Sequence, residues 1–206
     1  MQLGYSYRLR AVGIVFAVSE LDNAGMGVPQ RIFIELATER LCLRAPDERD
    51  IAPWFARATD RESAALAGDA VPESLAAGVE WLARARLQRA EGRAFKWAIH
   101  RRGDGDSIGS ITLSFKPEDP QLAELGFVLA RAFWGQGLGT EAAHTVLRFA
   151  FDALGVSEVR AEAAARNLAS RRILAKLGFV LMESFVDPSD GEPCEFYRLT
   201  GASLRS

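Results

Sequence analysis

Hydrophobic positions along the chain follow two different periods, which predicts a protein of mixed helices and strands. Spacings of three and four residues, typical of one buried helix face, recur in four segments, at 47–58, 72–90, 143–154 and 167–178. Alternating or short apolar runs predict strands at 40–44, 95–100, 108–115, 123–129, 159–163, 179–185 and 195–199. The order β-α-α-β-β-β-α-β-α-β-β predicts an α/β (α+β) layer fold whose first half is antiparallel.

The helices differ in how clearly their ends and faces are marked. In the segment 72–90, Pro72 suits a first turn, and Leu75, Val79, Leu82 and Leu87 form a stripe expected to pack inward. The segment 143–154 ends near Gly155, and the last helix begins at Asn167 and ends at Gly178. An apolar stripe marks the buried face of 143–154: Ala143, Val146, Leu147, Ala150, Phe151 and Leu154.

The length of 206 residues and the lack of repeats predict one domain over residues 31–206. Residues 1–30 do not share the pattern of this domain. Arg8 and Arg10 precede a short apolar run, but the run is too short for a secretory signal and no clear cleavage site comes after it. We expect a loosely ordered N-terminal extension, with Met26 as an alternative start of the protein.

Composition and charge exclude several classes of protein. With 49% hydrophobic and 25% charged residues and a net charge of −2, the chain has no basic footprint for nucleic acid. No apolar run approaches the roughly 20 residues of a membrane-spanning helix. The two cysteines and two histidines have no metal-ligand spacing, so we expect no metal site and a reduced, cytoplasmic protein without nucleic-acid or membrane partners.

Three glycines at alternate positions, Gly135, Gly137 and Gly139, separate an apolar run from a strongly periodic helix. Such a turn exposes backbone N–H groups at a helix N-terminus and favours an anion, most often a phosphate. A dinucleotide-binding fingerprint needs a further glycine spacing, and here Thr140 follows Gly139. Glu162 could still imitate the ribose-binding acid, so an NAD(P)-dependent oxidoreductase remains an alternative.

Three motifs in this order are similar to the GNAT N-acetyltransferases, and TERLCLR at 38–44 is similar to their ribosomal-protein N-terminal acetyltransferase branch. The motifs are LAELGFVL at 122–129, WGQGLGTEA at 134–142 and NLASRRILAKLGF at 167–179. The resemblance implies a mixed, mostly antiparallel twisted sheet with helices on both faces and a splayed central strand pair. It implies acetyl-CoA as the acetyl donor and a primary amine, such as a protein N-terminus or a small amine, as the acceptor.

The resemblance also implies where acetyl-CoA is held. In the family the glycine-loop amides hold the pyrophosphate, and the strand before the loop pairs with the pantetheine arm. A splayed strand leaves N–H and C=O groups that an amide-bearing arm can satisfy. Transferred to this sequence, the candidate cofactor-binding residues are Phe127, Val128, Leu129, Trp134, Gly135, Gln136, Gly137, Leu138, Gly139, Thr140 and Asn167.

The chemistry needs a base for the amine and a proton for the leaving thiolate. Glu124 is the candidate base because strand parity separates it from its apolar neighbours. Many family members carry a Tyr in the helix after the Asn motif, and this chain carries Ser170 as the candidate proton donor. Asn167 either bonds the cofactor arm, caps its helix, or does both. Trp134 either covers the cofactor or anchors the loop on the core.

The acceptor is expected between the early helices and the closing hairpin. That hairpin carries Asp187, Asp190 and Glu192, and Asp60 and Glu62 lie near the end of the first helix. An acidic rim would attract a cationic amine, although a solvated acidic loop explains the same residues. A second alternative function is a GNAT-like module that senses acyl-CoA without turnover. The sequence favours neither a monomer nor a homodimer.

Overall fold

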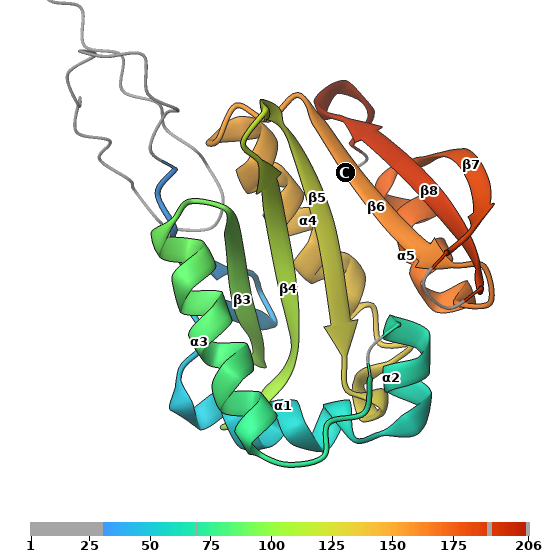
Figure 1. Cartoon of the computed structure of the whole chain (residues 1–206). Coiled ribbons are helices and arrows are strands. Elements are labelled where there is room, and N and C mark those ends of the chain that lie inside the picture. The colour runs from blue at the N-terminus through green and yellow to red at the C-terminus, as the bar shows by residue number, and fades with distance from the viewer. Residues whose placement is uncertain (1–30, 69, 189–190, 205–206) are drawn as a thin grey trace, which may run out of the picture.

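One twisted sheet of eight strands runs through the protein, in the order β1-β2-β3-β4-β5-β6-β8-β7 (Figure 1). The structure, a computed structural model, describes residues 31–68, 70–188 and 191–204. The N-terminal extension expected at residues 1–30 lies outside these ranges. Neighbouring strands are antiparallel except β5 and β6, which are parallel. The mixed, mostly antiparallel sheet expected from the sequence is therefore confirmed.

The elements succeed one another along the chain with short connections. The strands are β1 (Leu36–Ala37), β2 (Leu41–Arg44), β3 (Ala94–Arg101), β4 (Ser107–Lys116), β5 (Asp119–Leu129), β6 (Glu158–Ala164), β7 (Val180–Val186) and β8 (Pro193–Thr200). The α-helices are α1 (Ile51–Ala58), α2 (Arg61–Ala67), α3 (Ala76–Ala90), α4 (Leu138–Asp152) and α5 (Leu168–Leu177). Short 3₁₀ turns are η1 (Glu48–Asp50), η2 (Arg131–Phe133) and η3 (Gly201–Ser203).

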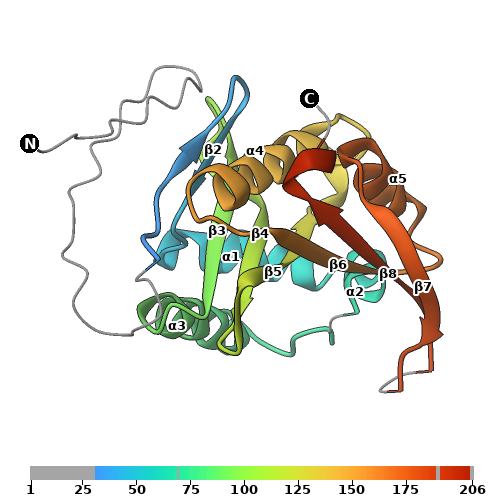
Figure 2. The ribbon, with the colours of Figure 1, turned by 90° about the horizontal axis from the view of Figure 1, so that it is seen from above.

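Helices cover both faces of the sheet, with α4 and α5 on one face and α1, α2 and α3 on the other (Figure 2). Side chains alternate accordingly on β5: Ala123 and Leu125 are buried toward α4, whereas Glu124 and Gly126 are exposed. The strand parity expected for Glu124 is thus what the structure has. Glu124 faces the side of the sheet that carries α1, α2 and α3.

The main core lies between the sheet and α4. The side chains of Phe95 and Trp97 on β3 are fully buried, and Trp97 contacts Phe149 of α4 edge to face, with ring centroids 6.0 Å apart. The indole N–H of Trp97 donates to the carbonyl of Ile34 at 2.7 Å, which satisfies its only polar atom. This packing fixes α4, and with it the glycine loop, against the sheet.

The predicted helices of the second half are confirmed. In α4 the residues Ala143, Val146, Leu147 and Ala150 are fully buried, because their spacing places all four on one face. α5 begins with Asn167, whose Oδ1 accepts from the Ser170 backbone N–H at 3.0 Å, and it ends at Gly178 with φ +93°.

The inward stripe predicted for residues 72–90 is wrong. The helix α3 begins at Ala76, and of the four stripe residues only Leu82 is buried; the other three are about half exposed: Leu75 51%, Val79 56% and Leu87 54%. The packed face instead holds Gly78, Leu82 and Ala85. A Cβ on Gly78 would lie 2.8 Å from Cγ2 of Ile51 in α1, so the two helices approach along a line of small residues.

The first half also holds elements that the sequence pattern missed. The segment 47–58, expected as one helix, divides at Asp50 into η1 and α1. Helix α2 was not predicted; Asp60 caps its start and Gly68, with φ +70°, ends it. Strand β1 was also missed, because two residues carry no detectable period. Of the helices described, none is long and apolar enough to cross a membrane.

Candidate active site

The parallel strands β5 and β6 diverge toward their carboxyl ends in the middle of the sheet (Figure 1). We refer to the stretch without pairing between them, from Leu125 to Leu129 on β5 and from Ala161 to Ala164 on β6, as the cleft. Their pairing covers three register pairs and stops at Glu124↔Arg160. β5 continues to Leu129 paired only with β4, and β6 continues to Ala164 paired only with β8. Backbone groups of β5 that point toward β6 over this stretch can pair with an extended, amide-bearing ligand. Of the residues expected to line the cofactor arm, Phe127 and Val128 are half-buried here, and Leu129 is buried.

The glycine loop lies where β5 ends, at the mouth of this cleft. Gly135 and Gly137 take φ values of +73° and +78°, and Gly137 is the N-cap of α4. The first helical bond of α4 runs from the Glu141 N–H to the Gly137 carbonyl. The N–H groups of Leu138, Gly139 and Thr140 therefore stand at the helix N-terminus, which suits an anion.

Two side chains hold the loop in place. The indole N–H of Trp134 donates to the Leu129 carbonyl at 2.8 Å, and its ring packs on the core. The carboxamide of Gln136 donates to the Ala132 carbonyl at 2.9 Å. These contacts favour the anchoring interpretation of Trp134 over a covering one.

Gly139 brings three elements of the site together. A Cβ at this position would lie 3.0 Å from Cδ1 of Ile173 in α5 and 3.4 Å from Cδ1 of Leu129 in β5. The start of α4 therefore packs tightly against both, and the helix N-terminus stays fixed relative to the cleft.

Arg40 is a contact of the glycine loop that the sequence did not indicate. Its Nη1 donates to the Gln136 carbonyl at 3.0 Å, and its Nε donates to Oε2 of Glu141 at 2.6 Å. Thr38 also donates through its hydroxyl to the Glu141 carboxylate. Glu141 therefore joins α4 to the turn between β1 and β2. About 100 residues separate the partners in sequence, so no local pattern could reveal the pair.

The start of α5, which follows β6, lies on the β6 side of the cleft. The carboxamide of Asn167 is engaged at both ends: Oδ1 accepts from the Ser170 N–H, and Nδ2 donates to the Leu66 carbonyl at 3.1 Å. Asn167 therefore caps α5 and ties it to α2. Ser170 lies half-buried in the first turn of α5, on the same side of the sheet as the glycine loop.

On the face of the sheet opposite α4, helix α2 connects the β5 side of the cleft to the β6 side. At its start, Glu62 forms an ion pair of 2.8 Å with Arg131, which follows β5. At its end, the guanidinium of Arg166 donates to the Ala65 carbonyl at 3.1 Å and lies 3.4 Å from Glu192 of the hairpin that joins β7 and β8. α2 thus links the carboxyl end of β5 to the loop after β6.

Two acids expected at the site, Glu124 and Asp187, act on a third that was not expected there, Glu162. Burial, followed by the charges of Glu124 and Asp187, raises the pKa of Glu162, and Lys116 partly offsets this effect. Glu162 therefore lies within electrostatic reach of both carboxylates. The position of Glu162 in the sequence indicated only the ribose-binding acid of the dinucleotide alternative. Glu162 was therefore not predicted as a residue of the acetyltransferase site.

The acidic rim expected around the acceptor is largely committed to other contacts. Glu62 pairs with Arg131, Glu192 with Arg166, and Asp60 caps α2 by accepting from the Ser63 N–H at 2.8 Å. Asp190 lies outside the described residues. Among the described rim residues, Asp187 is the one whose charge raises the pKa of Glu162.

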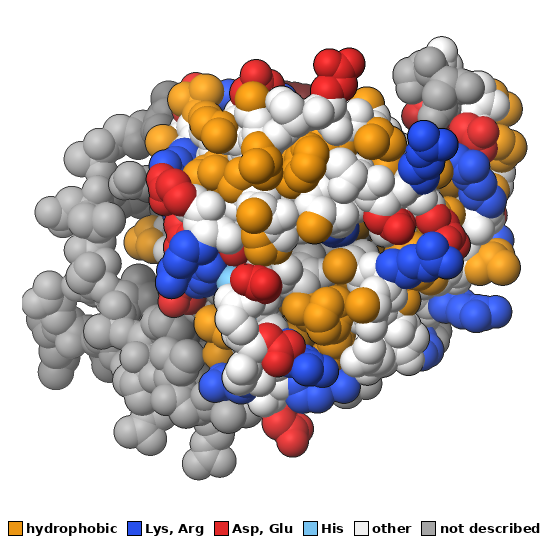
Figure 3. Space-filling view, turned by 90° about the horizontal axis from the view of Figure 1, so that it is seen from below, with side chains coloured by type: hydrophobic (Ala, Val, Ile, Leu, Met, Phe, Trp, Pro, Cys, Tyr) orange, Lys and Arg blue, Asp and Glu red, His pale blue; other side chains and the backbone are white. Residues whose placement is uncertain are grey.

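An open pocket of about 610 Å³ lies beside the glycine loop, on the side of α1. Figure 3 shows the molecule from below, where acidic and basic side chains lie close together on the surface. The walls of the pocket come from α1, from the turn between β3 and β4, and from η2. The residues that line it are Pro53, Ala56, Arg57, Asp60, Asp104, Gly105, Asp106, Ser107, Ile108, Ala130, Arg131 and Phe133.

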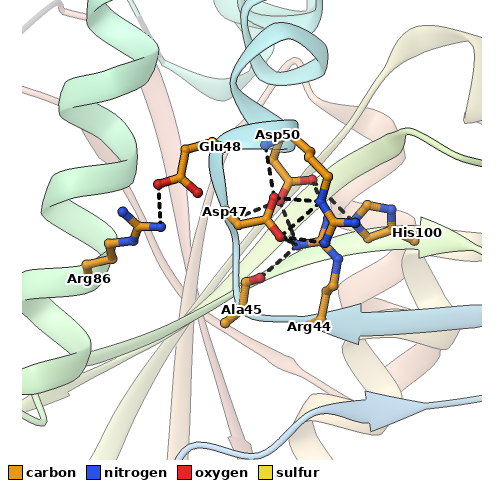
Figure 4. A network of polar contacts seen from close by, with 8 residues as sticks. Arg44, Ala45, Asp47, Glu48, Asp50, Arg86 and His100 are labelled. Atoms are coloured by element: carbon orange, nitrogen blue, oxygen red, sulfur yellow. Dashed lines mark hydrogen bonds and ion pairs between the residues drawn. The ribbon is translucent and has the colours of Figure 1, made fainter.

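A buried ionic network fixes the start of α1, one wall of this pocket (Figure 4). Arg44 of β2 and His100 of β3 both reach Asp50, whose side chain is 1% exposed. Burial alone raises the pKa of Asp50, but the contacts of His100, the Asp47 backbone N–H and Arg44 outweigh it and keep that pKa below its usual value. α1 is therefore held on the sheet by an ionised carboxylate.

The divergent strands, the glycine loop at their mouth and the capped helix beyond them define an acyl-CoA-dependent acetyltransferase fold. A family model described as an acetyltransferase (GNAT) domain matches residues 40–180. The chain belongs to this GNAT family, and it is an N-acetyltransferase that uses acetyl-CoA. The family match overturns the dinucleotide alternative: the glycine loop does follow the first strand of the β5-α4-β6 unit, but this unit belongs to an acetyltransferase (GNAT) domain.

One curated relative is similar in sequence, and two solved structures share the fold. The uncharacterized N-acetyltransferase YoaA of Bacillus subtilis (strain 168) is 30% identical over 148 residues, which cover 72% of this chain and 84% of YoaA. RimL, a ribosomal L7/L12 alpha-N-protein acetyltransferase solved with coenzyme A, has a TM-score of 0.72 at 16% identity, covering 81% of this chain and 98% of RimL. Spermidine N-acetyltransferase from Vibrio cholerae, solved with CoA and spermine, has a TM-score of 0.68 at 16% identity, covering 79% of this chain and 96% of that enzyme.

Proposed function

We propose that this enzyme transfers acetyl from acetyl-CoA to a cationic primary amine, either a protein or peptide N-terminus or a small amine, by direct attack. The observation that carries the proposal is the cleft between β5 and β6, with the N-terminus of α4 at its mouth. The helix N-terminus fits a pyrophosphate, and the unpaired edge of β5 fits the amides of the pantetheine arm. Under this proposal the loop residues Gln136 to Thr140 bind the pyrophosphate, and Phe127 to Leu129 line the arm.

Glu124 and Ser170 take the two proton-transfer roles. Glu124 accepts a proton from the bound ammonium, directly or through water, and the neutral amine nitrogen then bonds to the thioester carbon and releases a second proton to solvent as the amide forms. The C–S bond then breaks, and the Ser170 hydroxyl gives a proton to the departing sulfur and regains one from solvent. Strand parity supports Glu124, and the place of Ser170 in the first turn of α5, on the β6 side of the cleft, supports Ser170.

The charge around Glu124 supports a cationic acceptor. Glu124, Glu162 and Asp187 interact on the face of the sheet away from α4, and the raised pKa of Glu162 reflects burial first and then repulsion by the other two. A protonated amine relieves this repulsion when it binds. By their names, RimL acts on the N-terminus of a ribosomal protein and the Vibrio enzyme on spermidine, and both acceptors are amines.

Two measurements test the proposal. Acetyl-CoA should raise the melting temperature, whereas NADPH should not, because binding to the native state alone stabilises it. Thiol release should then be measured with peptides beginning Ala, Ser or Thr and with spermidine and spermine. Release that depends on one of these amines supports the proposal. Tight CoA binding with no release over the whole panel would favour an acyl-CoA sensor, and stabilisation by NADPH alone would overturn the proposal.

A further inference from the structure

The side chain of Arg40 reaches the rear of the glycine loop from a distant turn. Arg40 directly precedes β2, and its guanidinium contacts the loop through the Gln136 carbonyl and α4 through the Glu141 carboxylate. Its Nη2 also lies 3.5 Å from the position that a Cβ on Gly137 would occupy. The guanidinium therefore lies directly against Gln136 and Gly137, the two residues that precede α4.

The contact with Gln136 fixes the direction of a neighbouring N–H group. A trans peptide unit is planar, so the carbonyl of Gln136 and the N–H of Gly137 point in opposite directions. Because the carbonyl is held toward Arg40 at 3.0 Å, the Gly137 N–H points away from Arg40. Arg40 thus orients the first donor of the turn, and the N–H groups of Leu138 to Thr140 come next in the first turn of α4.

The contact with Glu141 balances a negative charge at the same helix N-terminus. Burial alone raises the pKa of Glu141, but hydrogen bonds from the Thr38 hydroxyl and from Arg40 lower it below its usual value. Glu141 is therefore ionised at neutral pH, one turn from the loop amides. Without Arg40 this carboxylate would oppose a phosphate at the loop by like-charge repulsion.

We propose that Arg40 is a positioning residue for the acetyl donor: it aims the loop N–H groups at the pyrophosphate and neutralises Glu141 beside them. This inference rests on the proposed function, since it names a determinant of donor binding at the same site. Arg40 is itself about half exposed, with 48% of its side chain accessible. Glu141 is 20% exposed, so the pair is only partly open to solvent, and the test has to separate an effect on the ligand from an effect on the fold.

Donor truncation separates this role from a general structural one. Acetyl-CoA carries the pyrophosphate, whereas S-acetyl-pantetheine carries the same thioester without it. In the Arg40→Ala variant, the ratio of kcat/KM for acetyl-CoA to that for S-acetyl-pantetheine should fall about tenfold, the scale of one charge-assisted hydrogen bond. Arg40→Lys keeps the charge but loses the forked geometry, so its ratio should lie between those of the wild type and the alanine variant.

Two further variants sharpen the test. Arg102→Ala is the matched control. The Arg102 guanidinium donates at 2.9 Å to the Thr38 carbonyl, in the same turn as Arg40. This contact does not involve the glycine loop. The ratio for Arg102→Ala should equal that of the wild type. The double variant Arg40→Ala/Glu141→Gln should recover part of the loss, because it removes the unbalanced carboxylate together with the arginine.

The result that overturns the inference is an equal loss for both donors in Arg40→Ala, or no loss at all. If the wild-type enzyme acetylates none of the amines tested, the proposed function fails while this inference stays testable. Calorimetric affinities for CoA and for pantetheine then replace the kinetic ratios, with the same change of about tenfold expected in their quotient for Arg40→Ala and none for Arg102→Ala.

Discussion

Asp50 and Arg44 form a two-point ion pair, with Nη1 of Arg44 2.9 Å from Oδ2 of Asp50 and Nη2 3.1 Å from Oδ1. The carboxylate is buried, and Nε2 of His100 lies 3.2 Å from the same Oδ1. Asp50 also accepts from the Asp47 backbone N–H at 2.9 Å, which completes a capping box at the start of η1. One carboxylate thus joins two strands to the beginning of α1.

Replacing Asp50 by Asn should destabilise the protein by about 3 kcal/mol, because it leaves the Arg44 charge without its buried partner. Urea unfolding measured by circular dichroism gives this change. The pH dependence has a defined sign: since the folded pKa of Asp50 is lowered, its contribution is present above the unfolded value and is lost as pH falls through the folded value. The Asn variant should therefore lose less stability than the wild type on acidification below about pH 4.

Asp47→Asn provides the control for this experiment. Asp47 pairs mainly with the exposed Arg49, and Asn keeps the capping geometry, so the loss should stay below about 1 kcal/mol. The Asp47 hydrogen bonds with Arg49 lower its pKa to about 2, so this variant too should flatten the acid dependence slightly. Equal destabilisation by both variants would contradict the central role of Asp50.

Gly109→Ala should destabilise the protein by about 3 kcal/mol through overpacking. A Cβ at position 109 would lie 2.2 Å from the Val128 carbonyl oxygen and 2.9 Å from Cα of Leu129, and backbone atoms cannot rotate away. Gly126→Ala is the matched control on the partner strand, because no described atom lies within 4 Å of its Cβ position. Its melting temperature should stay near or slightly above that of the wild type. A similar loss in both variants would sink the steric argument.

Glu124→Gln should lower kcat by about 100-fold and shift the pH profile of kcat toward alkaline values, because the amide cannot accept the proton of the amine. Steady-state rates from about pH 6 to about pH 9.5 measure the profile. Glu158→Gln removes a carboxylate from the start of β6, where it pairs with Arg160, and should leave the profile in place. An unchanged profile in Glu124→Gln would remove Glu124 as the base.

Ser170→Ala should slow turnover about tenfold while the affinity for acetyl-CoA stays close to that of the wild type, because only the departing sulfur loses its proton donor. Calorimetry and steady-state kinetics together separate the two quantities. Ser157→Ala removes a serine hydroxyl at the opposite end of the β5–β6 pair and should change neither. A loss of affinity at constant kcat would assign Ser170 to binding instead.

The elements of the second half could be predicted because local sequence determines them. The buried stripe of α4 and the caps Asn167 and Gly178 are periodic or positional signals that tertiary contacts did not override. The buried face of α3 was predicted wrongly because it contains the small residues Gly78 and Ala85. Their small size matters only because another helix packs against them. Its exposed Leu75 and Val79 gave the stronger hydrophobic signal on the wrong face.

The residues of the site could be predicted only in part, because some of them act through partners that are distant in sequence. The glycine loop, Glu124 and Ser170 lie within motifs, so their places could be inferred from the order of the motifs. Arg40 and Glu162 act through partners far away in sequence, and only the fold brings them to the loop and to Glu124. The tie between Asn167 and Leu66 has the same origin, because it depends on α2, which no periodicity revealed.

The cleft between β5 and β6 leaves the sheet without one strand pairing that the donor itself would complete. Under the proposed function, every contact assigned to the loop and to the strand edge falls on the pyrophosphate and the pantetheine arm. Coenzyme A, the product that remains after acetyl transfer, carries both groups unchanged. Free coenzyme A is therefore a competitor for the same cleft, and the rate of the enzyme depends on the ratio of acetylated to free coenzyme rather than on the amount of acetyl-CoA alone.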